Sequence, residues 1–419
     1  MDFPFSHAVL LSFEGPDPYS LVGGLGTRVT ELSAALAQAG VETTLIFVGD
    51  PRLPPVEHPA NGLTYRRWCQ WISAYHPGNV YDGEYGKVPD YAGSAPPFVA
   101  EEIVRPAAAR GERVLVIAED WQTAPAAISL DAALRERGLR EHASLMWNAN
   151  NTYGFDFIDW GALRRAACVT TVSRYMRFEL WIRGIETLVI PNGIPQRLLG
   201  GPPQELVADT ESALRGRPLL VKVGRFDEDK RWMQAIEAFA QIRGAHPAAT
   251  LLVRGGREPY GAAVLARARE LGLGVEDVQI ASREPELVLD ALAAANAPVL
   301  NVRSFVPEEL LFAFYHVADA VLANSGKEPF GLVGLEVMAS GGVAVVGPSG
   351  EDYAEAFGNA IVCDTGDPRE LASYLETLLR DANLSRTIRA AGEATAERYT
   401  WNNVLGVLAE KAAYLAARF

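Results

Sequence analysis

The sequence predicts an α/β protein made of two doubly wound domains, each with a mostly parallel sheet between layers of helices. The chain has 419 residues, which exceeds one ordinary hydrophobic core and fits two domains of roughly 200 residues each. Short apolar runs alternate with helical patterns, as in βαβ units. A stretch rich in glycine and proline interrupts this alternation near the middle of the chain, which indicates a domain boundary.

The first half alternates strands and helices from its start. Apolar residues at helical spacing predict a helix over residues 25–39, and Gly40 ends the pattern. Further helices are expected around residues 99–110 and 124–137. The expected strands of this half are the apolar runs 7–13, 43–48, 114–118, 144–147 and 167–172.

The boundary is predicted near residue 200, because turn signals cluster at residues 191–193 and 200–203. The expected domains are residues 1–200 and 201–398, followed by a final helix over residues 399–419. In the second half, strands are expected at 219–223, 250–253, 278–281, 299–302, 320–323 and 343–346, and helices at 231–243, 260–271 and from 368 onward. Two Rossmann-like domains with a cleft between them should bind ligands at the carboxyl ends of their strands.

The composition excludes several classes of partner. The net charge is −14, from 38 basic and 52 acidic residues, which argues against nucleic acid and anionic lipid surfaces. No apolar run reaches membrane-spanning length, so stable membrane insertion is not expected. Cys69, Cys168 and Cys363 lie far apart and fit neither a metal site nor a disulfide framework. The N-terminus has no basic region before its first apolar run, so we expect a cytoplasmic protein. The oligomeric state stays open.

Two carboxylates, Glu328 and Glu336, stand eight positions apart in the second half, with Gly331 and Gly334 between them. A helix that begins near Gly331 would let both acids face one ligand and would offer free N–H groups to a phosphate. The acids could then bind sugar or ribose hydroxyls. The alternative is a capped surface helix with two incidental acids.

Two cations follow the strand 219–223, namely Arg225 and Lys230. At a strand end beside a helix start they can hold a diphosphate. The alternative is a solvated loop with local salt bridges. Between them, residues 227–229 read Asp-Glu-Asp, which we interpret as acids favourable to a helix start rather than as metal ligands.

In the first half, residues 22–26 form a glycine-rich turn that opens a helix, and Gly24 could let the backbone approach an anion. The spacing lacks the third small residue of a dinucleotide fingerprint, so a simple tight turn is the alternative. Residues 119–123 (Glu-Asp-Trp-Gln-Thr) follow the strand 114–118, and Asp120 could bind sugar hydroxyls or cap the next helix.

A polar cluster follows the strand 144–147, with Asn148 and Asn150 directly after Trp147. It could bind a sugar, or it could be a loop stabilised by asparagine side chains. Residues 58–97 carry many aromatic side chains, which could stack on an acceptor or pack as a surface subdomain. Residues 283–298 suggest an inserted helix without a functional reading.

Taken together, these motifs resemble retaining glycosyltransferases of the two-Rossmann-domain (GT-B) type. Glu328 and Glu336 are similar to their Glu-x7-Glu motif, and Arg225 with Lys230 to their Gly-Arg-x4-Lys element. Asp120 matches the aspartate of a His-Asp-Trp-His-Thr segment in glycogen and starch synthases, although both histidines are replaced. Because Glu336 is usual in glycosyltransferase family 4 and usually lacking in family 5, the chain is identified as a member of family 4 with a glycogen-synthase-like first domain.

The resemblance implies transfer of a hexosyl group, with glucose favoured, from a nucleotide sugar to a small-molecule or oligosaccharide acceptor, without a metal or cofactor. It implies an acceptor-binding first domain, a donor-binding second domain, and a final helix that crosses back to the first. The implied catalytic residues are Arg225, Lys230, Glu328 and Asp120. The implied donor-binding residues are Gly24, Arg225, Lys230, Phe330, Gly331, Leu332 and Glu336. The implied acceptor-binding residues are Asp120, Trp147, Asn148 and Asn150.

One departure leaves alternatives open. Trp147 stands where many relatives carry a histidine beside the reacting sugar. A catalytically silent nucleotide-sugar binder is therefore one alternative. A lipid or membrane-glycan transferase of the same fold is another alternative. The acidic net charge disfavours it, because such an enzyme would need a basic or amphipathic surface on its first domain.

Overall fold

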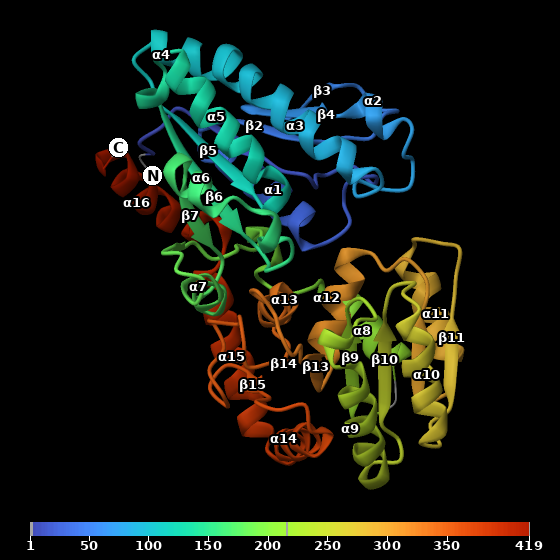
Figure 1. The fold of residues 1–419 in the computed structure, drawn as a ribbon. Helices are drawn as coiled ribbons and strands as arrows, with labels where there is room; N and C mark the ends of the chain where they lie inside the picture. The colour runs from blue at the N-terminus through green and yellow to red at the C-terminus, as the bar shows by residue number, and fades with distance from the viewer. Residues whose placement is uncertain (1–2, 215–216, 419) are drawn as a thin grey trace. The chain divides into compact units, whose positions relative to one another are not determined.

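The computed structural model describes residues 3–214 and 217–418. They form two compact units (Figure 1). Unit 1 comprises Met1–Gly193 and Tyr399–Phe419, and unit 2 comprises Ile194–Arg398. The division falls between Gly193 and Ile194, a few residues before the boundary expected near residue 200. Each unit is an α/β structure around its own sheet, so the predicted fold class, two Rossmann-like domains, is confirmed.

Unit 1 contains an eight-stranded sheet in the order β3-β4-β2-β1-β5-β6-β7-β8. Every neighbouring pair is parallel except β3 and β4, which form an antiparallel hairpin at the edge. The central strands are buried on both faces, which explains their nearly continuous apolar sequences. The strands are β1 (His7–Leu11), β2 (Glu42–Val48), β3 (Val56–Ala60), β4 (Leu63–Trp68), β5 (Val114–Glu119), β6 (Ala143–Ala149), β7 (Cys168–Thr171) and β8 (Leu188–Val189).

The helices of unit 1 cover both faces of this sheet. On one face, α1 (Gly24–Gln38) and α16 (Trp401–Arg418) pack into a core that alternate residues of β1, β2, β4 and β5 share. On the other face lie α3 (Glu84–Phe98) and α5 (Ala124–Glu136), which pack together (Figure 1). The remaining helical segments are α2 (Gln70–Ser73), a π-helix (Val99–Val104), α4 (Arg105–Ala109), α6 (Trp160–Ala166), α7 (Arg174–Trp181) and 3-10 turns at Trp121–Thr123, Arg140–His142 and Phe155–Phe157.

Unit 2 contains a seven-stranded, fully parallel sheet in the order β11-β12-β10-β9-β13-β14-β15. The strands are β9 (Leu219–Val223), β10 (Thr250–Arg254), β11 (Val275–Val278), β12 (Val299–Val302), β13 (Ala320–Ala323), β14 (Ala344–Val346) and β15 (Ile361–Val362). The order changes direction at β9 and β13, and such a point of an open parallel sheet is where ligands usually bind.

The main core of unit 2 lies between its sheet and α9 (Trp232–Ala245), α10 (Tyr260–Glu270) and α14 (Pro368–Arg380). On the opposite face lie α8 (Gln204–Ala213), α11 (Pro285–Ala294), α12 (Glu308–Val317) and α13 (Leu332–Ala339), while α15 (Ala382–Arg398) packs against α13 and α14. Two 3-10 turns complete the unit, at Gln196–Leu198 and Glu228–Lys230.

Most predicted elements lie within a residue or two of the observed ones, and one expectation needs correction. The strand expected at 278–281 lies at Val275–Val278 instead. The aromatic segment 58–97 contains the β3–β4 hairpin and α3, neither of which was predicted, and α3 includes Pro89, Pro96 and Pro97. Within the described residues, we find no helix that is long and apolar enough to cross a membrane.

Candidate functional site

The N-terminus of α13 in unit 2 is a candidate anion-binding element. The helix begins at Leu332, directly after Gly331, which adopts φ 82° and ψ 57°. The predicted helix start near Gly331 is therefore confirmed. Among the described residues, no side-chain hydrogen bond caps this end, so the first N–H groups of α13 can point at a ligand, with the positive end of the helix dipole behind them.

Lys230 and Glu328 meet beside this helix end. Lys230 closes the 3-10 turn after β9, Glu328 lies in the loop after β13, and the ammonium donates to Oε2 of the carboxylate. Both side chains are mostly buried, with 28% and 19% of their surfaces exposed. Ser349 Oγ accepts the backbone N–H of Glu328 at 2.7 Å and fixes the loop. The structure thus brings together two residues that the sequence proposed for the donor site.

Arg225 does not join this pair. Its guanidinium is exposed and lies 3.9 Å from the Asp227 carboxylate. Asp227 in turn accepts the N–H of Asp229 at 3.2 Å and caps the 3-10 turn. Residues 227–229 therefore act as turn acids, as the sequence suggested. Across the part of the chain that the structure describes, no group of three or more His, Cys, Asp and Glu side chains could hold a metal ion.

Glu336 lies in the second turn of α13, where burial raises the pKa of its carboxyl to about 7, with Glu308 as a smaller cause. Leu332 forms the first turn of the same helix and is half-buried. The ring of Phe330 is buried and packs 5.8 Å from the ring of Tyr353. The side chain of Phe330 belongs to the core, so only its main chain remains a candidate for donor binding.

Sequence reasoning missed Glu351, which packs against the same helix end. A Cβ atom on Gly331 would lie 2.5 Å from Glu351 Cγ, so the carboxyl group is seated directly on the glycine. Glu351 is 6% exposed, and its Oε2 atom has no hydrogen-bond partner among the described residues. Burial, followed by the nearby charge of Glu328, raises the pKa of this carboxyl well above its usual value. Its place after β14, at the same edge of the sheet as Lys230 and Glu328, was the signal that could have found it.

In unit 1, Asp120 follows β5 in an unusual backbone conformation, with φ 62°. Its Oδ1 accepts the N–H of Asn150 at 2.8 Å, and its Oδ2 accepts from Asn151 Nδ2 at 2.9 Å. Burial raises the pKa of Asp120 to about 7. A non-glycine residue at positive φ is costly and is held here by its surroundings, which is typical of functional sites.

Glu119, next to Asp120, is fully buried and organises the polar cluster. It accepts from Arg28 Nε at 3.2 Å, from Asn148 Nδ2 at 2.9 Å and from Asn150 Nδ2 at 2.7 Å. Asn148 and Asn150 are thus brought to Asp120 as the sequence suggested, and their amide groups are largely engaged by Glu119.

The side chain of Trp147 lies in the core, so a contribution of this residue to sugar binding would have to come from its main chain. The indole is fully buried and donates from Nε1 to the carbonyl oxygen of Asp120 at 2.9 Å. It also packs edge-on against Trp160 at 5.5 Å. Its role in this structure is to hold the strained backbone of Asp120.

Two exposed aromatic rings lie beside Asp120. Trp121 packs 5.1 Å from Phe157 and 6.5 Å from Tyr153, measured between ring centroids, and both partners are about 70% exposed. Tyr153 follows Asn151, whose Oδ1 accepts its N–H at 2.7 Å. Aromatic faces of this kind can stack on the apolar faces of sugar rings.

The glycine-rich turn before α1 is already occupied by a carboxylate of the chain. Oε2 of Glu14 accepts the N–H groups of Gly23 at 2.9 Å, Gly26 at 3.0 Å and Val22 at 3.3 Å. The turn does bind an anion, as its glycines suggested, but that anion is internal. Gly24 is exposed, and a Cβ atom there would meet nothing within 4 Å.

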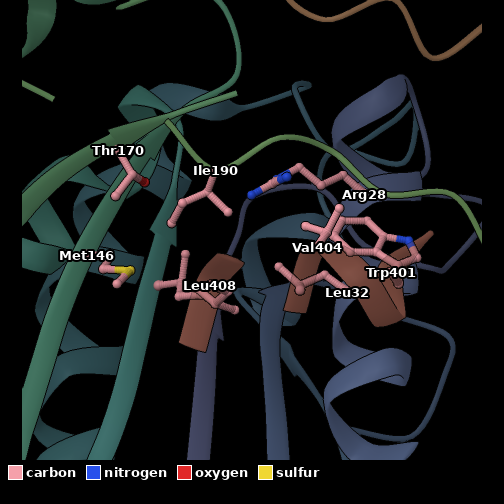
Figure 2. Close-up of a pocket in the computed structure, with 9 residues that line it drawn as sticks. Arg28, Leu32, Met146, Thr170, Ile190, Trp401, Val404 and Leu408 are labelled. Atoms are coloured by element: carbon pink, nitrogen blue, oxygen red, sulfur yellow. The ribbon is translucent and has the colours of Figure 1, made fainter. Parts of the chain in front are cut away.

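A small cavity lies beneath this edge of unit 1, where α16 packs on the sheet. Figure 2 shows Arg28 and Trp401 on one side of it and Thr170 and Met146 on the other. Its volume of about 10 Å³ has room for about one water molecule. The cavity is thus a packing defect and is too small for a sugar or a nucleotide.

Comparison with known proteins gives consistent similarities. Residues 208–395 match the family model described as glycosyl transferases group 1. Glycogen synthase of Mycobacterium tuberculosis is 26% identical over 435 residues, covering 98% of this chain and 94% of that protein. Among solved structures, sucrose-phosphate synthase from Thermosynechococcus elongatus has a TM-score of 0.69 at 21% identity, covering 99% of this chain and 100% of the other. Anabaena HepE in complex with UDP has a TM-score of 0.65 at 16% identity, covering 97% and 100%.

Proposed function

We propose that this chain is a glycosyltransferase that moves a glucosyl group from a nucleotide sugar to a small-molecule or oligosaccharide acceptor. The match of residues 208–395 to glycosyl transferases group 1 and the similarity of nearly the whole chain to glycogen synthase support this proposal. We further propose that the anomeric configuration is retained and that no metal ion is required. Unit 2 would bind the donor and unit 1 the acceptor. The glycogen synthase and sucrose-phosphate synthase relatives support glucose as the donor sugar.

The observation that carries this proposal is the Lys230–Glu328 pair beside the uncapped N-terminus of α13. In the donor complex, Lys230 and Arg225 would neutralise the diphosphate, and the first N–H groups of α13 would bind its oxygens. Glu328 would accept hydrogen bonds from hydroxyls of the transferred sugar. Glu336, which is half-buried further along α13, would accept from the ribose.

Retention would follow from a displacement on a single face of the sugar. The bond between the anomeric carbon and the phosphate oxygen breaks, the acceptor oxygen bonds to that carbon on the same face, and the acceptor proton passes to the departing phosphate oxygen. The protein then supplies positioning, worth about 7–11 kcal/mol in well-oriented systems, and stabilisation of the leaving charge. This route assigns no covalent nucleophile to the chain.

For the acceptor, the proposal rests on the edge of unit 1 around Asp120. The strained Asp120, the Asn148–Asn150 segment and the exposed rings of Tyr153 and Phe157 combine hydroxyl-binding groups with stacking surfaces. Such a combination suits an uncharged sugar ring. Trp147 would contribute only by fixing Asp120 from behind.

A thermal-shift screen of the purified protein with UDP-, GDP- and ADP-sugars and the free nucleotides is the first test. A ligand present at 100 times its Kd should stabilise the fold by about 2.7 kcal/mol, which gives a measurable rise in Tm. The stabilising nucleotide sugar is then incubated with glucose, maltose and longer oligosaccharides, with and without EDTA. Proton NMR of the product identifies the anomeric configuration.

The expected result is an α-linked product from an α-linked donor, formed equally well in EDTA. An inverted product would contradict retention, and loss of turnover in EDTA would contradict the metal-free proposal. Donor binding with neither transfer nor hydrolysis would identify a catalytically silent nucleotide-sugar binder. Activity that appears only with lipid-linked acceptors in liposomes would identify a membrane-glycan transferase.

A further inference from the structure

The loop between β14 and β15 holds the N-terminal end of α13 through three side chains. Ser349 Oγ accepts the N–H of Glu328 at 2.7 Å, and the Tyr353 hydroxyl donates to the carbonyl of Gly331. Between them, Glu351 packs on the Cα of Gly331. Residues 349–353 therefore contact the same short segment that carries Glu328 and begins α13.

Ser349 and Tyr353 each have a hydrogen-bond partner that explains their place, whereas one carboxyl oxygen of Glu351 has none among the described residues. Its Oε2 atom is buried and unpaired among the described residues, although a buried polar atom without a partner costs about 1–3 kcal/mol. A leucine or methionine would fill the same space against Gly331 without that cost. An unpaired polar atom at this position, beside Lys230 and Glu328, points to a hydrogen bond that forms only with a ligand.

We propose that Glu351 is a further donor-recognition residue, whose unpaired carboxyl oxygen hydrogen-bonds a hydroxyl group of the transferred sugar beside Glu328. This inference rests on the proposed function of the site. It assigns the sugar to Glu351 rather than the diphosphate for two reasons. The charge of Glu328 acts on Glu351 more strongly than that of Lys230, so the electrostatic surroundings of Glu351 disfavour a further anion such as a phosphate. A hydroxyl can also donate to a carboxylate or accept from a carboxylic acid, whereas a phosphate would repel the ionised form.

Burial and the charge of Glu328 both raise the pKa of Glu351, which favours the neutral carboxylic acid over the carboxylate. A neutral acid that donates a hydrogen bond in a site of low polarity is a known use of a buried carboxyl group. Glutamine has nearly the same shape and also donates and accepts, whereas methionine keeps the length and the packing but has no hydrogen-bonding hydrogen. These two substitutions therefore separate hydrogen bonding from packing.

The test measures Kd by calorimetry for UDP-, GDP- and ADP-glucose and for the three free nucleotides, with the wild type and with Glu351→Gln and Glu351→Met. We expect Glu351→Met to bind the preferred nucleotide sugar at least about tenfold more weakly, the effect of losing a hydrogen bond worth about 1.4 kcal/mol. The free nucleotide should bind within about twofold of wild type. Glu351→Gln should bind both ligands nearly as the wild type does. Glu355→Gln, an exposed acid in the same loop, is the matched control and should change neither.

Two results would overturn the inference: an unchanged affinity of Glu351→Met for the nucleotide sugar, or an equal loss for the nucleotide sugar and the free nucleotide. If Glu351→Met fails to fold, a wild-type crystal soaked with the nucleotide sugar decides the matter. A sugar hydroxyl should then lie within about 3.2 Å of a Glu351 carboxyl oxygen, and its absence would reject the assignment. If the wild type binds none of UDP-glucose, GDP-glucose and ADP-glucose, the proposed glucosyl donor is itself rejected, and the inference with it. Wild-type binding that the variants leave intact rejects the inference alone.

Discussion

Lys230 and Glu328 form an ion pair although 98 positions separate them in the sequence. Their strands, β9 and β13, are neighbours in the parallel sheet, so the loops that follow these strands emerge at the same edge. The uncapped end of α13 lies directly after the Glu328 loop. The order of the strands in the sheet thus places the Lys230 ammonium, the Glu328 carboxylate and the first N–H groups of α13 next to one another.

Replacing Lys230 tests whether its ammonium group stabilises the leaving diphosphate. We expect Lys230→Ala to lower kcat about a hundredfold, because removing one group that stabilises a leaving charge costs about 3 kcal/mol in the barrier. Lys327→Ala is the matched control, since Lys327 is exposed and adjacent to Glu328 in sequence. Steady-state kinetics of both variants, with far-UV circular dichroism to confirm the fold, provide the measurement. Comparable turnover in the two variants would remove Lys230 from the mechanism.

Glu336 should make the stability depend on pH. Its pKa is about 7 in the folded protein and lies near 4.3 in an unfolded chain, so protonation favours folding. This contribution is complete below about pH 4 and is lost as the pH rises to about 7. Glu336→Gln has no such loss, so it should exceed the wild type in stability at pH 8 by about 1–2 kcal/mol, a value reduced for the partial exposure of the side chain. Urea denaturation at pH 5 and pH 8 measures the difference, which should shrink at the lower pH. A difference independent of pH would contradict this account.

Gly331 should not tolerate alanine. Its φ of 82° strains any other residue, and a Cβ atom would overlap Glu351 Cγ at 2.5 Å. We expect Gly331→Ala to lose about 1–3 kcal/mol of stability together with donor affinity. Gly244→Ala is the control, because Gly244 lies inside α9 with nothing within 4 Å of the added atom. That substitution should stabilise the protein by about 0.5–1 kcal/mol. Thermal melts with and without nucleotide measure both effects, and equal Tm values for the two variants would refute the contrast.

Glu14 should stabilise unit 1 through the turn before α1. Its carboxylate accepts three backbone N–H groups and the hydroxyl of Tyr81. Glu14→Ala should therefore cost about 2–3 kcal/mol, because several partly or fully buried donors lose their acceptor together. Glu14→Gln keeps one acceptor oxygen and should lose clearly less. Chemical denaturation of both variants is the measurement. A loss below about 0.5 kcal/mol in Glu14→Ala would show that the turn satisfies its N–H groups in another way.

The alternation of apolar runs and helical patterns was sufficient to predict the fold class, because strands buried on both faces leave a strong signal. Elements with a weaker signal were missed: β3 is fully exposed, and α3 contains three prolines that normally argue against a helix. Lys230, Glu328 and the start of α13 at Leu332 could be located in advance because each follows a recognisable strand or glycine.

The partners of these residues could not be predicted from the sequence. Whether two side chains meet depends on the direction in which the folded backbone points them and on how deeply it buries them. This holds for three contacts: Glu14 with the glycine turn, Glu119 with Arg28, and Glu351 with Gly331. Trp147 is a further example. The sequence correctly placed it at the end of a strand, but it could not show that the indole lies in the core.

The membership of α16 in unit 1 has a consequence for how the chain is made. Trp401, Val404, Leu405 and Leu408 complete a core whose other members come from β1, β2 and α1. On a ribosome, unit 2 can finish folding from one continuous stretch while the earlier-synthesised unit still lacks this helix. Nascent unit 1 must therefore wait, with an apolar face uncovered, until the whole of unit 2 has been translated. Once α16 has left the ribosome, it can cover this face and complete the unit that was begun first.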